Sequence, residues 1–318
     1  MLNFAATGRK RIAIRCLLLL ALFMASARAV VPQRVVSINL CTDQLLVLLA
    51  QRDRIQSLSY LAANPEVSPV AELAAGIVEN YGSAEEVLNF NPDLVLASVF
   101  GAHSTNAILK RLGIRLVEIP VARNIQEIRE SIRTVAAAIG SPASGEALLK
   151  KFDRDLQAAS LSPARVSAHP SDRFDLEGSP LRAARNAVAA LFRENNVVYG
   201  SGTISGVFVK AAGMDNLADK LDHSAFSYMP LEILIEQKPD VIVQAQGTLR
   251  AARGILAYES LHHPAMQNLL EKSRLVRIPD SLWSCGSPAI VDAIAKLAAA
   301  HRQWREERKP RSLVDDAR

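Results

Sequence analysis

The stretch SAEEVLNFNPDLVLAS, residues 83–98, decides the fold, because a second stretch, PLEILIEQKPDVIVQA, residues 230–245, has the same plan. Each one reads as a short helix, a Pro-Asp turn and an apolar β-strand, with Pro92 corresponding to Pro239 at an offset of 147 residues. A Pro-Asp turn before an apolar strand is ordinary loop chemistry when it occurs alone. The pair becomes informative because each copy is succeeded by a further matching segment.

A second pair of similar stretches is present, one stretch after each copy of the first. RLVEIP, residues 115–120, is matched by RLVRIP, residues 274–279, at an offset of 159. Two matches in one order predict two lobes of similar topology, and the offset is too long for a solenoid repeat. Strands that alternate with helices indicate crossover connections and parallel sheets. We therefore expect an α/β protein of two lobes, each a mainly parallel sheet flanked by helices.

A helix and a loop separate the two expected lobes. Leu149, Phe152 and Leu156 recur at helical spacing, so residues 144–161 are expected to form a long connecting helix. Residues 162–182 are rich in Pro, Ser and charge without periodicity, which indicates a surface loop. The remaining expected parts are an N-terminal lobe at 30–143, a C-terminal lobe at 183–309 and a tail at 310–318.

The first 29 residues have the form of a secretory signal peptide. They carry five Arg and Lys residues and no acid, and an apolar run at 16–25 precedes Ala27-Arg28-Ala29. The run is too short to span a bilayer. Cleavage near Ala29 leaves 32 basic against 32 acidic residues, so the net charge of +5 is no argument for nucleic-acid binding. An uncleaved signal anchor is the alternative.

Motifs for catalysis and for metal binding are missing or incomplete. Gly200, Gly202 and Gly206 miss the dinucleotide fingerprint, because the third glycine comes one residue late. The pair His262-His263 has no carboxylate or Cys at ligand spacing, which favours a solvated loop over a metal site. No P-loop, zinc-protease motif or nucleophile elbow occurs. We predict no catalytic residue, no cofactor and no metal site.

Residues just past the predicted strands are the candidates for a binding site, because the carboxyl ends of parallel strands form the ligand crevice of open α/β sheets. Any one aromatic residue there is explained more simply as core packing. As a group they favour ligand contact, since aromatic residues make up only 5% of the chain. The candidates are Cys41, Tyr60, Phe100, Tyr199, Ser201, Thr203, Trp283 and Cys285.

Several segments together carry a resemblance to a known family. Their order and spacing resemble the periplasmic substrate-binding proteins of ABC importers for iron complexes and vitamin B12, over nearly all of the chain after the signal. The resemblance implies two lobes joined by a rigid helix, with the ligand in a cleft between them. The segments are the first strand through Tyr60, the block at Ser83, residues 200–216 (GSGTISGVFVKAAGMDN), the block at Pro230 and WSCGSPAIVDAI from Trp283.

The same resemblance implies a function and partners. It implies a soluble, monomeric periplasmic protein that captures an iron complex, such as a ferric siderophore or haem, or a corrinoid. It delivers that ligand to an ABC permease in the inner membrane and makes or breaks no bond. Neutral and aromatic groups suit such a large, partly apolar chelate. The alternative from another class is an exported α/β enzyme that uses the same crevice.

Individual residues acquire expected roles from the resemblance. Tyr60 matches an aromatic residue that contacts the corrinoid, and Trp283 matches a tryptophan close to the site. A further tryptophan of the vitamin B12 binder is replaced near Glu79 and Asn80, which disfavours vitamin B12 itself as the ligand. Asn80 and Tyr81 complete the expected ligand-binding set. We expect Tyr60 and Trp283 to face each other across one cleft.

Docking to the permease is expected to involve Glu85. This residue matches a carboxylate of the family that pairs with permease arginines, whereas the corresponding position of the second lobe holds Lys210. The alternative is that the acidic pair only begins a helix, with Ser83 as the cap and Glu86 completing the capping box. We expect Glu86 to cap and Glu85 to lie free on the surface near the mouth of the cleft.

Cys41 and Cys285 are the cysteines that remain after signal removal. An even pair in an exported protein is ordinarily a disulfide. Each follows a strand of a different lobe, however, and a bond would need Cα atoms within about 7 Å and would hold the lobes shut. We therefore expect two free thiols lining the cleft, either in contact with the ligand or packed against apolar neighbours.

Overall fold

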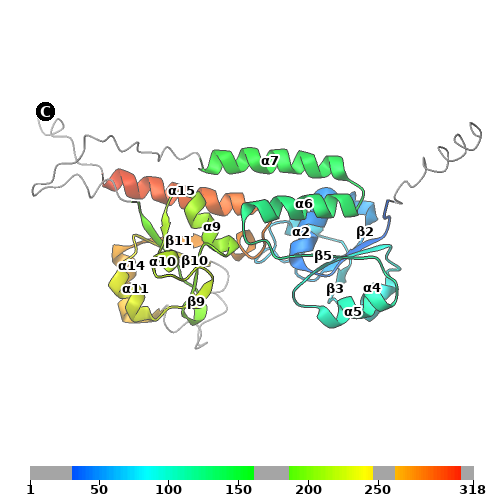
Figure 1. Ribbon diagram of the computed structural model, residues 1–318, viewed down its shortest axis with the longest axis horizontal. Helices are drawn as coiled ribbons and strands as arrows, with labels where there is room; N and C mark the ends of the chain where they lie inside the picture. The colour runs from blue at the N-terminus through cyan, green and yellow to red at the C-terminus, as the bar shows by residue number, and fades with distance from the viewer. Residues whose placement is uncertain (1–30, 161–185, 246–261, 309–318) are drawn as a thin grey trace, which may run out of the picture.

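The computed structural model describes residues 31–160, 186–245 and 262–308. Figure 1 shows two lobes side by side, with helix α7 (Pro142–Ser160) running along the upper side across their junction. The two-lobed α/β architecture is thus confirmed, and α7 occupies the position expected for the connecting helix. The expected signal peptide at 1–29, the surface loop at 162–182 and the tail at 310–318 lie outside the described residues.

The first lobe, named the N-lobe, is built on a parallel sheet of strand order β3-β2-β1-β4-β5. Side chains alternate between its faces. Val35 and Leu94 pack with α2 and α6 on one face, whereas Val36 and Val95 pack with α4 and α5 on the other. The elements are β1 (Val35–Ser37), α2 (Leu40–Leu49), the 3-10 turn η1 (Arg52–Arg54), β2 (Ile55–Ser59), α3 (Ala71–Ala74), β3 (Glu79–Asn80), α4 (Ala84–Asn89), β4 (Leu94–Ser98), α5 (His103–Arg111), β5 (Leu116–Ile119) and α6 (Ile125–Ala138).

The second lobe, named the C-lobe, repeats this plan with strand order β11-β10-β6-β8, all parallel. A two-stranded antiparallel ribbon, β7 with β9, is added to it. The elements are β6 (Val188–Leu191), η2 (Glu194–Asn196), β7 (Val197–Tyr199), α9 (Ile204–Ala211), β8 (Asp215–Asn216), α10 (Leu217–Lys220), β9 (Phe226–Tyr228), α11 (Leu231–Gln237), β10 (Val241–Ala245), α14 (Pro264–Lys272), β11 (Arg274–Ile278), η4 (Asp280–Leu282) and α15 (Ile290–Glu307).

The internal repeat of the sequence is a repeat of structure. Strand β10 begins 147 residues after β4, and α11 begins 147 residues after α4. The Pro-Asp turn recurs because its carboxylate ties neighbouring strands together. Asp93 accepts hydrogen bonds from the backbone N–H of Gln33 and of Arg34, just before β1, at 2.8 and 2.9 Å. Asp240 accepts one from Val188 N–H, at the start of β6, at 2.9 Å.

One continuous apolar core joins the two lobes. It runs from β1 and α2 through α6 and α7 to α15 and the strands of the C-lobe. At the junction Gly286 packs against the N-lobe so closely that an added Cβ would lie 2.5 Å from the Cβ of Ala122. Along the described residues, no helix has the length and apolar character needed to cross a membrane.

A disulfide crosses this junction between Cys41 and Cys285, so the expectation of two free thiols is wrong. Their Cα atoms lie 5.3 Å apart, well within bonding range. Both residues do follow strands of opposite lobes, as expected. Those strand ends are not separated by an open cleft, however, because the two lobes meet there in the shared core. The bond therefore lies at the base of the junction and not across its mouth.

Helix α2 begins with a hydrogen-bonded first turn beside this disulfide. Asn39 caps the helix by accepting from Cys41 N–H at 2.9 Å, and the hydroxyl of Thr42 is hydrogen-bonded to Ser37 Oγ at 2.8 Å. Asp43 is buried and accepts hydrogen bonds from the hydroxyl and the N–H of Ser59. Burial raises the pKa of Asp43 from 3.8 to about 7, against the opposing effect of these serine hydrogen bonds.

The disulfide is expected to stabilise the protein through the long loop that it closes. A Cys41→Ala/Cys285→Ala double variant should lose roughly 2–5 kcal/mol of unfolding free energy, because the cross-link restricts the unfolded chain. Urea unfolding with and without reductant measures this. Reductant should lower the wild-type midpoint and leave that of the double variant in place. Two titratable thiols in unreduced, denatured protein lacking residues 1–29 would contradict the bond.

Asp43 is expected to make stability fall as pH rises toward neutrality. Because its pKa is raised on folding, the native protein keeps a proton that the unfolded chain releases above pH 3.8. The resulting stabilisation is complete below that pH and is lost as pH rises through about 7. Asp43→Asn should therefore flatten the pH dependence, by roughly 4 kcal/mol between pH 4 and 8. Urea unfolding of both proteins across this range checks it; parallel pH profiles would contradict the assignment.

Candidate functional site

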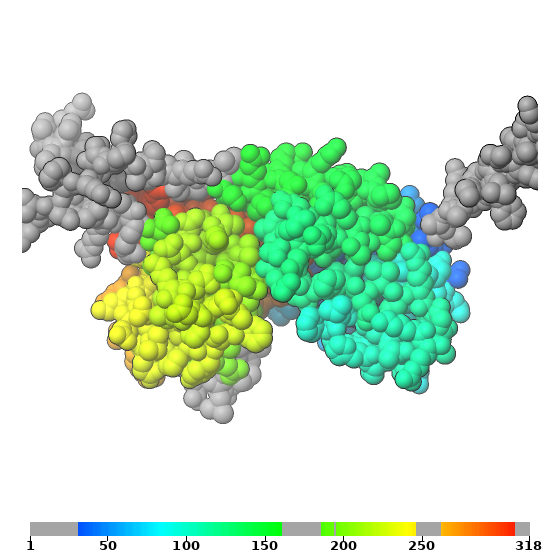
Figure 2. Space-filling model, in the orientation of Figure 1, coloured from blue at the N-terminus to red at the C-terminus, as the bar shows by residue number. Residues whose placement is uncertain are grey.

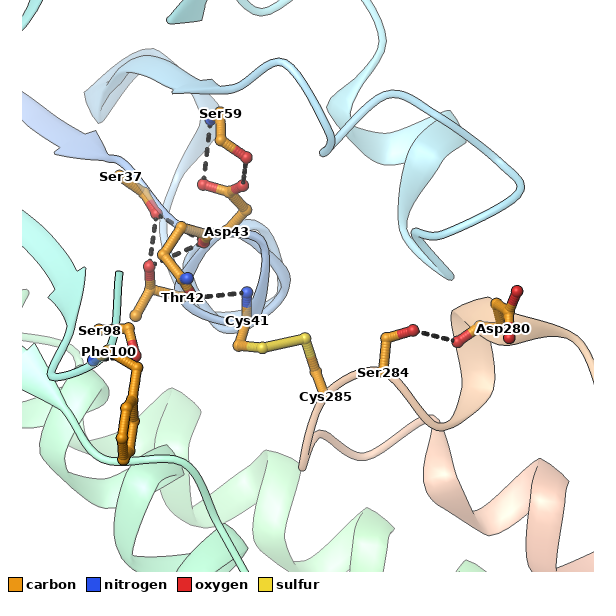
Figure 3. Close-up of a disulfide and its surroundings, with 11 residues drawn as sticks. Ser37, Cys41, Thr42, Asp43, Ser59, Ser98, Phe100, Asp280, Ser284 and Cys285 are labelled. Atoms are coloured by element: carbon orange, nitrogen blue, oxygen red, sulfur yellow. Dashed lines mark hydrogen bonds between the residues drawn. A yellow bond between two sulfur atoms is a disulfide. The ribbon is translucent and has the colours of Figure 1, made fainter. Parts of the chain in front are cut away.

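The carboxyl edges of the two sheets face each other. Cys41 follows the end of β1 and Cys285 follows the end of β11, so the bond between them fixes both edges at one junction. Figure 3 shows this arrangement, with Phe100 on the N-lobe side and Ser284 on the C-lobe side. Figure 2 shows the surface hollowed between the lobes on the side away from α7. A ligand held between the lobes would lie in this hollow.

Tyr60 and Tyr81 form a stacked pair at the N-lobe edge. Ser59 on β2 is in register with Asn80 on β3, and Tyr60 N–H donates to Asn80 O at 2.9 Å. The residues that follow therefore emerge together, with ring centroids 4.9 Å apart and planes tilted by 20°. Tyr60 is 47% and Tyr81 71% exposed. Parallel register thus converts two strand ends into one aromatic surface open to solvent.

Phe100 adds a third exposed ring to the same edge. It follows β4, and its N–H donates to Ser98 Oγ at 3.1 Å, which holds the start of the loop against the strand end. Its ring remains largely exposed, unlike the buried phenylalanines of the core. Large exposed apolar groups that gather at one edge mark interaction sites, so Tyr60, Tyr81 and Phe100 remain the N-lobe candidates.

The C-lobe contributes two exposed rings that the sequence pattern did not single out. Phe226 and Tyr228 lie on β9, which pairs with β7, and β7 is tied to the end of β6 by a bridge between Phe192 and Val198. The ribbon therefore continues the carboxyl edge of the C-lobe sheet. The sequence F-S-Y carries the signal for this, because alternate residues of a strand share a face. Both aromatic side chains are thus presented on the same exposed side.

Trp283 does not face the hollow. Its ring is only 3% exposed, and Nε1–H donates to Asp280 Oδ1 at 2.9 Å. The guanidinium of Arg193 lies 5.3 Å from the ring centroid and 3.6 Å from the same Asp280 oxygen. The expectation that Trp283 faces Tyr60 across a cleft is therefore wrong. This tryptophan is fixed inside its own lobe by a carboxylate at its edge and a cation over its face.

Other predicted site residues serve the fold. Asn80 is buried, and its amide donates to Ser37 O at 3.0 Å and to Ser57 Oγ at 2.8 Å, which ties the ends of three strands together. Thr203 caps α9 by accepting from Gly206 N–H at 3.1 Å. Tyr199 is half-buried against the core, whereas Ser201 is exposed.

The glycines of this segment are explained by close packing of the backbone. A Cβ at Gly200 would lie 1.9 Å from the carbonyl oxygen of His223, and one at Gly206 would lie 1.9 Å from that of Gly200. Only glycine fits such approaches. The glycine pattern therefore follows from the turn into α9.

The parts of the chain that the structure describes contain no group of three or more His, Cys, Asp or Glu side chains placed to hold a metal ion.

The two acidic residues at the start of α4 have the different roles expected of them. Ser83 and Glu86 form a reciprocal capping box, and Glu85 is exposed. The internal repeat gives Glu85 a counterpart in the second lobe: Glu232 lies at the same offset of 147, in the first turn of α11, and is exposed. Lys210 is exposed in the last turn of α9.

Solved structures share this fold over nearly their whole length. A periplasmic heme-binding protein from Roseiflexus sp. RS-1, in apo form, superposes with a TM-score of 0.63 at 21% identity, covering 86% of this chain and 99% of that one. The periplasmic vitamin B12 binding protein of Vibrio cholerae superposes with a TM-score of 0.58 at 16% identity, covering 87% and 99%.

Sequence comparison identifies the family. A cobalamin-binding protein of Halobacterium salinarum is 25% identical over 274 residues, which are 85% of this chain and 69% of that protein. The family model described as periplasmic binding protein matches residues 35–268, which include the sheets of both lobes up to β10. This match confirms the resemblance seen in the sequence. The chain belongs to the periplasmic binding protein family.

Proposed function

We propose that this protein binds a metal chelate with a flat, partly apolar ring, haem or a corrinoid, between its two lobes and delivers it to an ABC permease. The observation that carries the proposal is the set of exposed rings at the facing sheet edges: Tyr60, Tyr81 and Phe100 on one lobe, Phe226 and Tyr228 on the other. Aromatic side chains contribute large contact area and stack on planar groups. The relatives that bind heme, vitamin B12 or cobalamin support this ligand class.

A ferric siderophore is the less favoured ligand within the same class. The stacked tyrosine pair is a flat, neutral surface, which matches the face of a macrocycle better than the irregular surface of a siderophore. We further propose that the protein is exported to the periplasm through a signal peptide cleaved near Ala29. There it acts as a monomer and leaves its ligand chemically unchanged. An exported enzyme that uses the same hollow is the alternative, and it would alter the ligand.

Ligand binding is expected to depend on the N-lobe ring pair. Protein lacking residues 1–29 should bind hemin or cobalamin with a shifted absorption spectrum, and Tyr60→Ala should weaken this binding about tenfold or more. Leu112→Ala, which truncates an exposed apolar residue after α5, is the matched control and should leave affinity unchanged. Recovery of intact ligand after release separates binding from turnover. Equal affinities of the two variants would remove the aromatic site, and lack of binding to either ligand would overturn the function.

The two ligands can be separated by the phenol groups. Tyrosine oxygen is one of the axial ligands that proteins supply to haem iron. A Tyr60→Phe/Tyr81→Phe variant keeps both rings and removes both oxygens. If a phenol oxygen ligates haem iron, this variant loses affinity for hemin. If the rings only stack on the ligand, the variant keeps the wild-type affinity for cobalamin. Measuring both affinities therefore tells which chelate the pair is built to hold.

Permease docking is proposed for the exposed acidic residues that begin α4 and α11. Figure 1 shows both helices on the outer, lower parts of their lobes, on the side away from α7. Glu85 and Glu232 occupy equivalent positions of the internal repeat, so each lobe would offer one carboxylate to a basic partner surface. This assignment replaces Lys210 as the C-lobe counterpart. It gives the two lobes a matched docking charge.

Charge reversal should separate docking from binding. Glu85→Lys and Glu232→Lys should each reduce uptake of the bound chelate by cells that depend on this protein, because like charges repel at the interface. Ligand affinity of the purified variants should remain that of the wild type. Glu130→Lys, at an exposed position of α6, which packs against α7, is the matched control and should transport normally. Normal uptake by both test variants would exclude this docking mode.

A further inference from the structure

A cavity of about 420 Å³ lies where α2, α7 and the start of α15 meet. Leu48 lines it from α2, Leu148 from α7 and Val291 from α15, and Pro69 lines it from the loop before α3. None of the exposed rings proposed to hold the chelate is among the lining residues. The cavity is therefore separate from the hollow between the sheet edges, and its size is typical of small-molecule sites.

The apolar wall of this cavity is open to solvent. Leu48 is 37% exposed although most of α2 is buried, Pro69 is exposed, and Leu148 and Val291 are partly exposed. Each of these residues thus lines the cavity and keeps surface that an occupant can cover. Removing apolar surface from water is favourable, so an apolar ring or chain that fills the cavity is stabilised there.

The charged residues of the cavity leave one carboxylate without an ion partner. Lys151 Nζ is paired with Asp155 at 2.5 Å, so these two charges offset each other. Asp292 also lines the cavity; it is exposed in the first turn of α15 and forms no ion pair within the described part of the chain. The helix N-terminus adds about half a positive charge, which is less than the full charge of the carboxylate. The cavity is therefore negative, and the ligand that complements its charge is a cation.

We propose that this cavity is a second binding site, for a small organic cation that carries one ammonium group on an apolar ring or chain. The ammonium pairs with Asp292, and the apolar part covers Leu48 and Leu148. Because the lining comes from the N-lobe, from α7 and from α15, an occupant bridges the junction of the two lobes. Binding to the native protein alone raises its melting temperature.

Benzylamine, which is protonated at neutral pH, is the probe that tests this site. Two-dimensional NMR on protein lacking residues 1–29 should show saturable binding with a Kd on the order of 1–10 mM, and the shifts should map to α2, α7 and the start of α15. Benzyl alcohol, which has the same ring without the charge, should bind about threefold more weakly, and benzoate more weakly still. Salt at about 1 M should remove the preference for benzylamine, because it screens the carboxylate.

Two variants locate the bound benzylamine. Asp292→Asn removes the charge and should weaken benzylamine binding about threefold, while leaving the binding of benzyl alcohol unchanged. Leu48→Phe fills the cavity from its exposed rim and should weaken the binding of both molecules about threefold or more. Glu306→Gln, which removes an exposed carboxylate further along α15, is the matched control and should bind benzylamine like the wild type.

The outcomes decide between this site and the hollow. Melting temperatures verify that the three variants fold. No saturable benzylamine binding, an unchanged benzylamine affinity of Asp292→Asn or of Leu48→Phe, or NMR shifts confined to the exposed rings of the hollow would each overturn the proposal. All three variants should bind hemin or cobalamin like the wild type, and none of the benzylamine results depends on the function proposed for the interlobe hollow.

Discussion

The arrangement of the two lobes depends on their junction, where the Cys41–Cys285 disulfide joins them and one continuous apolar core runs from one lobe into the other. The bond joins the first turn of α2 to the loop before α15, and Gly286 beside it packs onto Ala122. Covalent and apolar contacts therefore act at the same place. They fix the carboxyl edges of the two sheets toward each other, which is the condition for any site that draws residues from both lobes.

This junction also limits how the lobes can move. A bond at the base prevents the sheet edges from separating there, so the exposed rings can approach or part only by small rotations about that point. The connecting helix α7 packs against both α6 and α15, which restrains the same rotation from the other side. A binding protein built this way recognises a ligand with largely preformed surfaces, and it loses little conformational freedom on binding.

The sequence predicts those features that follow from backbone pattern. The Pro-Asp blocks predict β4 and β10 because Asp93 and Asp240 have the same local task, and the S-x-x-E pattern predicts the cap of α4. Sequence order carries no information on where a side chain points after a strand ends. The inward turn of Trp283 toward Asp280 was therefore not predictable. The local sequence around each cysteine likewise does not show that two residues 244 positions apart come together.

The properties of the N-lobe edge follow from strand register and burial together. Register brings Tyr60 and Tyr81 into one stacked surface, and the buried amide of Asn80 beneath them holds the strand ends in that register. Asp43, close by in the first turn of α2, has its pKa raised to about 7 by burial, so near neutral pH much of the protein carries it as the uncharged acid. The N-lobe edge thus presents aromatic faces to solvent, and α2 adds little fixed negative charge behind them.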